Sequence, residues 1–122
     1  MASTTTITKA GKHKLLKARA GIATLPAVTQ MAFGNGADGN TPSESDNELK
    51  NELLRKNLTG VEQITETNFR YVCTLTTAEL QNAVINEIAL CDADGDLVVI
   101  RNCSDKHKDD DEEMTFEIDD KF

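Results

Sequence analysis

Tryptophan is absent from this sequence of 122 residues, and the other aromatic residues are few, with one tyrosine and four phenylalanines. Aliphatic side chains must therefore dominate any core. No apolar run approaches the ~20 residues that a membrane-spanning helix needs. The basic start of the chain is not followed by the apolar region and cleavage site of a signal peptide. These absences predict one soluble globular domain over residues 1–122 that stays in the compartment where it is made.

Cysteine is also scarce, with only Cys73, Cys91 and Cys103. An odd number at wide spacing argues against a disulfide framework and against a zinc site built from paired ligands. Cys73 falls in an alternating strand pattern and Cys91 ends an apolar run, so we expect both to be small core residues. A reducing compartment fits this pattern best.

Acidic residues are missing from the first part of the chain. Residues 1–37 carry a charge of +5 and no acid, whereas residues 38–122 carry eight basic and all 21 acidic residues, a net −13. The two parts should attract each other, either by intramolecular docking or by head-to-tail assembly of copies. The net negative charge of residues 38–122 disfavours nucleic acid as the main partner.

No recognisable catalytic motif is present. His13 and His107 have lysine neighbours and lie near no serine or cysteine in a nucleophile motif. Glu87 stands within an apolar run, where we expect it to face outward or to pair with Arg70 or Arg101. We therefore expect a protein that is not an enzyme, with no catalytic residues.

Two segments resemble ligand-binding loops without matching them. The Gly34–Gly39 loop lacks the Gly-Lys-Ser/Thr ending of a phosphate-binding loop. The Asp92–Asp96 segment has its glycine in the fourth position, whereas a calcium-binding EF-hand loop needs it in the sixth and a glutamate in the twelfth. A tight hairpin turn explains the second segment without an ion. We expect no cofactor and no metal, and the alternative is a small metal- or nucleotide-binding protein that uses these segments. The run at 109–113 is expected to be a solvated loop.

The sequence predicts an α+β fold, organised around a hairpin over residues 83–101, where two β-branched runs flank the Asp94-Gly95 turn signal. A mainly antiparallel sheet is expected to contain strands at 27–34, 61–75, 83–91, 97–102 and 114–120. Residues 65–68 are a candidate turn within the second of these strands.

Two or three short helices are expected on one side of the sheet. The first follows an N-cap at Thr8 and ends at Gly21 or Pro26. The second spans residues 46–57, because Ser45 and Glu48 fit a capping box and leucines follow at helical spacing. A further helical turn is expected at 76–82. Residues 1–6 show no periodicity and are expected to be disordered or to form an arm. Residues 1–22 would form a basic arm and helix, and 23–122 an acidic α+β body.

Three blocks of sequence resemble the N-terminal domain of the phage tail-collar fibre protein family. They are Ile7-Thr8-Lys9-Ala10-Gly11, then Val28-Thr29-Gln30-Met31-Ala32-Phe33-Gly34-Asn35-Gly36, and then Asn86-Glu87-Ile88-Ala89-Leu90-Cys91-Asp92-Ala93-Asp94-Gly95-Asp96-Leu97. Family members typically show a Thr/Lys-rich start, an "xMAxGxG" block and an "xExGLxDxDGxL" block in this order. Two departures are Ala89, where glycine is usual, and Cys91, where an aromatic residue is common.

The resemblance implies a structural module that fastens a tail fibre to the baseplate of a contractile phage tail or tailocin. Such a protein would be assembled in the bacterial host cytoplasm, with baseplate or fibre proteins as partners and several copies together, a trimer being favoured. Typical members continue into a shaft and a receptor-binding tip, so receptor binding is not transferred to this sequence. We expect a shortened chain or a stand-alone attachment subunit. The candidate partner-docking residues are Lys9, Lys12, Lys14, Leu15, Leu16, Lys17, Arg19 and Ile22.

Overall fold

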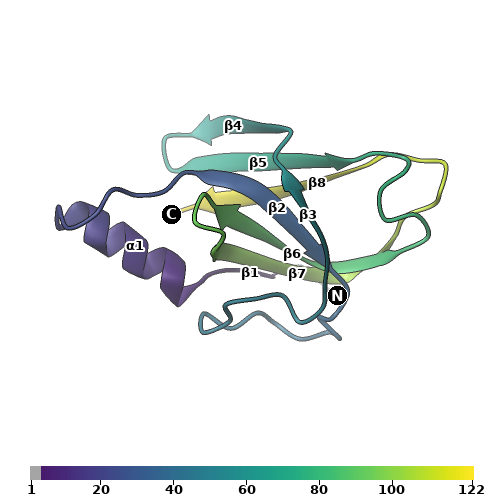
Figure 1. The fold of residues 1–122 in the computed structure, drawn as a ribbon, viewed down its shortest axis with the longest axis horizontal. Helices are drawn as coiled ribbons and strands as arrows, with labels where there is room; N and C mark the ends of the chain where they lie inside the picture. Colours follow the sequence, from purple (N-terminus) through teal and green to yellow (C-terminus); the bar gives the residue numbers. More distant parts are fainter. Residues whose placement is uncertain (1–3) are drawn as a thin grey trace.

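The computed structural model describes residues 4–122, which form one helix and eight strands (Figure 1). In chain order the elements are β1 (Thr4–Ile7), α1 (Lys9–Arg19), β2 (Val28–Gly34), β3 (Glu52–Asn57), β4 (Gly60–Thr65), β5 (Asn68–Leu75), β6 (Val84–Asp92), β7 (Leu97–His107) and β8 (Met114–Lys121). Within these residues, no helix is long and apolar enough to cross a membrane.

The strands form two antiparallel sheets. The larger has the order β1-β7-β6-β2-β3, and the smaller has the order β4-β5-β8. The expected central hairpin is present as β6 and β7, which lie inside the larger sheet. Residues 85–92 of β6 are all buried, as expected for a strand covered on both faces.

The core lies between the two sheets, which pack face to face. Phe33 of β2 meets Phe116 of β8 edge-on, with ring centroids 5.3 Å apart. Most of the rest is aliphatic or sulfur-containing, as the shortage of aromatic residues predicted. The other core members are Met31, Cys73, Leu75, Ile85, Ile88, Leu90, Val99 and Ile118. A second cluster, which includes Ala32, Ala89 and Leu49, lies on the other side of β2 and β6.

The expectation of an α+β fold with several helices is wrong, because the described residues contain a single helix and about half of them lie in strands of two antiparallel sheets. Residues 52–57 form the edge strand β3, which pairs with β2 from Gln30↔Asn57 to Gly34↔Glu52. Their leucine spacing fits a helix, but pairing with a neighbouring strand overrides a local propensity of a few tenths of a kcal/mol per residue.

Residues 76–82 form turns and not a helix. Glu79 does accept a hydrogen bond from the backbone N–H of Thr76, at 2.8 Å, as the capping pattern predicted. The chain then enters the left-handed region at Leu80 (φ 49°) and Asn82 (φ 58°), which stops helical growth.

Two further boundaries differ from the prediction. Strand β7 continues to His107, because its end pairs with the start of β6 through Ile85↔Lys106 and Val84↔His107. Residues 4–7 form β1, which pairs with β7 and is not disordered. The remainder of the predicted disordered segment, residues 1–3, lies outside the described residues. The turn expected near residues 65–68 does divide that region into the hairpin β4–β5.

Candidate docking site

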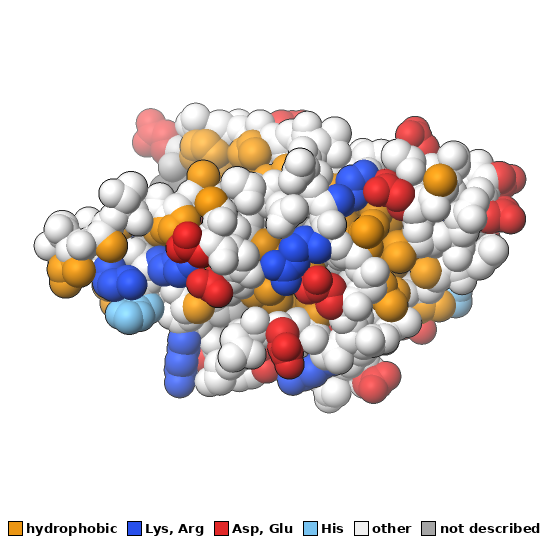
Figure 2. Space-filling view, in the orientation of Figure 1, with side chains coloured by type: hydrophobic (Ala, Val, Ile, Leu, Met, Phe, Trp, Pro, Cys, Tyr) orange, Lys and Arg blue, Asp and Glu red, His pale blue; other side chains and the backbone are white. Residues whose placement is uncertain are grey.

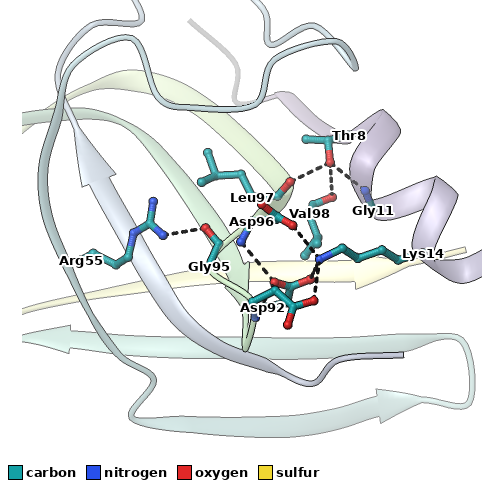
Figure 3. A network of polar contacts seen from close by, with 10 residues as sticks. Thr8, Gly11, Lys14, Arg55, Asp92, Gly95, Asp96, Leu97 and Val98 are labelled. Carbon is teal, nitrogen blue, oxygen red and sulfur yellow. Dashed lines mark hydrogen bonds and ion pairs between the residues drawn. The ribbon is translucent and has the colours of Figure 1, made fainter. Parts of the chain in front are cut away.

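Thr8 joins β1, α1 and β7 at one point (Figure 3). Its buried hydroxyl accepts a hydrogen bond from the N–H of Gly11, at 3.0 Å, and donates one to the carbonyl of Leu97, at 2.8 Å. The N–H of Thr8 donates to the carbonyl of Val98, at 3.0 Å. This confirms the predicted N-cap and shows that the cap also attaches the helix to the sheet.

Close approach at Gly11 sets how α1 lies on β7. A Cβ atom at this position would stand 2.7 Å from the carbonyl oxygen of Val98. Gly11 is the only fully buried residue of α1. Glycine within a helix costs stability relative to alanine, but at this position it permits the close contact with β7.

Lys14 holds α1 against the turn between β6 and β7. Its ammonium nitrogen lies 2.6 Å from a carboxylate oxygen of Asp92, 2.8 Å from Asp96 and 3.2 Å from Asp94. The other oxygen of Asp92 accepts the backbone N–H groups of Asp94 and Asp96, at 3.0 and 3.1 Å. Asp92 therefore closes the hairpin turn with one oxygen and binds the helix with the other (Figure 3).

Burial opposes the charged form of Lys14, but its hydrogen bonds to Asp92, Asp96 and Asp94 together outweigh this effect. They raise the pKa of Lys14 above the ordinary lysine value. Carboxylate oxygens of the three aspartates lie within 4.8 Å of one another, a grouping that suits a hard cation. In this structure the ammonium of Lys14 occupies that position.

The glycine-rich segment after β2 is bound by side chains of β6. Glu87 is 2% exposed, and its carboxylate accepts backbone N–H groups from Gly36 at 2.8 Å and from Lys50 and Asn51 at 2.9 Å. The next N–H of the loop, that of Ala37, donates to Asn86. Glu87 and Asn86 would have to release these backbone N–H groups before the loop could bind a phosphate.

Glu87 therefore neither faces outward nor pairs with Arg70 or Arg101, contrary to prediction. Arg70 instead pairs with Asp119 at 2.7 Å, and Arg101 donates to the carbonyl of Glu117 at 2.8 Å. Sequence reasoning missed the role of Glu87 because its partners are backbone groups. The glycines at 34 and 36 were the available signal, since both allow the close approach of that carboxylate.

The eight predicted docking residues lie on α1 and the turn that follows it, but in different surroundings. Lys14 is bound within the molecule, and Lys12 pairs with Glu44 at 2.6 Å on the surface. Leu15 faces a groove beside the sheets, whereas Leu16 and Ile22 are 59% and 74% exposed. Lys9 and Arg19 are exposed, and Lys17 is half-buried.

The third of the sequence blocks singled out above contacts the other two. The carbonyl of its Leu97 accepts the hydroxyl of Thr8 from the first block, and the carboxylate of its Glu87 accepts the N–H of Gly36 from the second. The matching family model is that of the phage tail-collar fibre protein, N-terminal, and it covers residues 1–117. The chain belongs to this family.

A comparison with curated proteins found no match, and neither did a comparison with solved structures. Membership of the tail-collar fibre family gives the chain a structural role in a phage tail, where it associates with other tail proteins. The family is structural and not typically enzymatic.

Proposed function

We propose that this tail-collar fibre domain fastens a fibre to the baseplate of a contractile phage tail or tailocin, as one of several copies, with a trimer favoured. The observation that carries the proposal is that α1 is firmly anchored while apolar side chains on and beside it are exposed. The helix is held on the body by Thr8 and Lys14, yet Leu16 of the helix and Ile22 of the turn that follows it are exposed to solvent.

Large exposed apolar side chains on a rigidly held element are typical of an interface. Lys12 and Lys14 are paired with carboxylates within the molecule, whereas Lys9, Lys17 and Arg19 form no ion pair within residues 4–122, so these three suit an acidic partner. Exposed ion pairs contribute only about 0–1 kcal/mol each. Leu16 and Ile22 would therefore provide most of the affinity, while Lys9, Lys17 and Arg19 would steer and orient the encounter.

Particle incorporation tests this proposal. Truncating residues 1–22 would also remove β1 and Thr8, so surface substitutions are the sharper change. The variant L16S/I22S should fold normally but be depleted from purified tails, measured by quantitative mass spectrometry of particles. The matched control is Leu53→Ser, because Leu53 is 38% exposed on β3, away from α1. Full occupancy of the double variant would overturn the proposal.

A further inference from the structure

Asp120 is a half-buried carboxylate on the inner face of the smaller sheet. In the alternation of β8 it follows Phe116 and Ile118, whose side chains lie in the core between the sheets. The carboxylate of Asp120 forms no ion pair or hydrogen bond within residues 4–122. Burial raises its pKa, because no neighbouring cation stabilises the charged form.

The preceding residue, Asp119, shows the contrast. Its side chain lies on the opposite face of β8, where it pairs with Arg70 at 2.7 Å. The hydrogen bond from Arg70 lowers the pKa of Asp119. A half-buried carboxylate without such a partner costs stability, so the fold itself gives no reason for an aspartate at position 120.

Asp120 lies on the wall of a groove of about 230 Å³ between α1 and the smaller sheet. Leu15, Leu25 and Pro26 line the helix side of this groove, and Tyr71 lines the sheet side with Asp120. Burial, and after it the negative charge of Asp120, raise the pKa of Tyr71, so the two side chains lie close together. Figure 1 shows the C-terminal end of β8 next to α1, and Figure 2 shows hydrophobic side chains at this end, beside α1 and over β4. The groove therefore combines apolar walls with one carboxylate.

The cationic side chains around the groove are bound elsewhere. Lys14 also lines it, but its ammonium is held by the three aspartates of the β6–β7 turn. Arg70 and Arg101 line a neighbouring cavity that also reaches Asp120, and they bind a carboxylate and a backbone carbonyl of β8. The charge of Asp120 is thus available to a cation from another molecule.

We propose that this groove binds a lysine or arginine side chain of another tail protein, with the charged end on Asp120 and the apolar stem along the helix side. Lysine and arginine combine an apolar stem with a cationic end, which is the complement of this groove. An ion pair that is partly shielded from water contributes more than an exposed one. The inference rests on the proposed function and adds the chemistry of the partner and its site.

Asp120→Asn tests the role of the carboxylate, because it keeps the shape of the side chain and removes the charge. The midpoint of thermal unfolding should be unchanged or raised, since the half-buried charge has no partner within the described residues. Incorporation into purified tails, measured by quantitative mass spectrometry, should fall by about fivefold or more. The matched control is Asp111→Asn, an exposed residue of the acidic loop, which should change neither quantity. A lower midpoint would show that the carboxylate serves the fold, and full incorporation would show that no partner needs it; either result would overturn the proposal.

Photo-crosslinking identifies what occupies the groove. Tails are assembled with p-benzoylphenylalanine in place of Leu25, irradiated and analysed by peptide mass spectrometry. The expected product joins this position to a peptide of another tail protein with a lysine or arginine close to the attachment point. Attachment to a second copy of this chain, to a peptide without a basic residue or to no protein would overturn the assignment.

The two proposals fail separately. Depletion of L16S/I22S from tails together with full incorporation of Asp120→Asn would remove the groove assignment and leave the proposed function. Full incorporation of L16S/I22S would instead overturn the proposed function itself.

Discussion

The carboxylate of Glu87 lies 2.8 Å from the backbone nitrogen of Gly36 and accepts its hydrogen bond inside the protein. The same side chain accepts the N–H groups of Lys50 and Asn51. Glu87 thus binds both ends of the long connection between β2 and β3. This connection places Leu49 in the second apolar cluster, with Ala32 and Ala89. By binding the connection, the carboxylate of Glu87 holds it over that face of the larger sheet.

Replacing Glu87 with glutamine should lower the free energy of unfolding by roughly 2–4 kcal/mol. The amide keeps one acceptor oxygen but places donor hydrogens against backbone N–H groups, which leaves buried donors unpaired. Chemical denaturation measures the loss. Glu48→Gln is the control, because Glu48 is exposed, and it should change stability by less than about 0.5 kcal/mol. Equal effects at both positions would contradict the importance of the buried contact.

Gly34→Ala should be destabilising by about 1–3 kcal/mol. Its new Cβ would stand 2.4 Å from the carbonyl oxygen of Asn51 and 2.6 Å from the Glu87 carboxylate. Gly60 provides a matched control in β4, because a Cβ there meets nothing within 4 Å. Thermal unfolding should show a lower midpoint for Gly34→Ala and an unchanged or slightly raised midpoint for Gly60→Ala.

Lys14→Met should loosen α1 without unfolding the sheets. The substitution keeps the apolar stem but removes the ammonium, so Asp92, Asp94 and Asp96 repel one another and lose their link to the helix. Amide hydrogen exchange in residues 12–19 should become about tenfold faster or more. Lys9→Met is the control and should leave exchange unchanged, since Lys9 is exposed. Unaltered protection of α1 in Lys14→Met would show that Thr8 and Gly11 suffice.

The buried thiols should be unreactive in the folded protein. Burial raises the pKa of Cys91 to about 11 and also raises the pKa of Cys73 and Cys103. At pH 8 a thiol reagent should therefore label the protein only after denaturation. Rapid labelling under native conditions would contradict the burial of these side chains.

The raised pKa of Cys91 also makes the free energy of unfolding depend on pH. An unfolded cysteine loses its proton near pH 8.5, well below the pH of about 11 at which Cys91 loses its proton in the folded protein. The unfolded state therefore binds fewer protons in this range, and the free energy of unfolding should fall as the pH rises from about 9 to 11. Denaturation curves across this range should show a smaller decline for Cys91→Ala than for wild type.

Much of the strand pattern could be predicted from the sequence, because it depends on neighbours along the chain. Alternation located β2, β5 and β8, and the Asp94-Gly95 signal located the central turn. Thr8 was identified as an N-cap for the same reason, since its hydroxyl binds an N–H only three residues away. The three sequence blocks also sufficed for the family assignment.

Contacts between distant residues decided the rest. Residues 52–57 have a helical spacing of leucines and became a strand because the edge of β2 was available for pairing. The sequence showed that basic and acidic parts should attract, but only the fold brings Lys14 to Asp92, 78 residues away in the chain. Glu87 could not be paired from sequence, because its partners are backbone N–H groups, which every residue except proline carries. Their position depends on the packing of the sheet and the loop, and this is information that no local pattern contains.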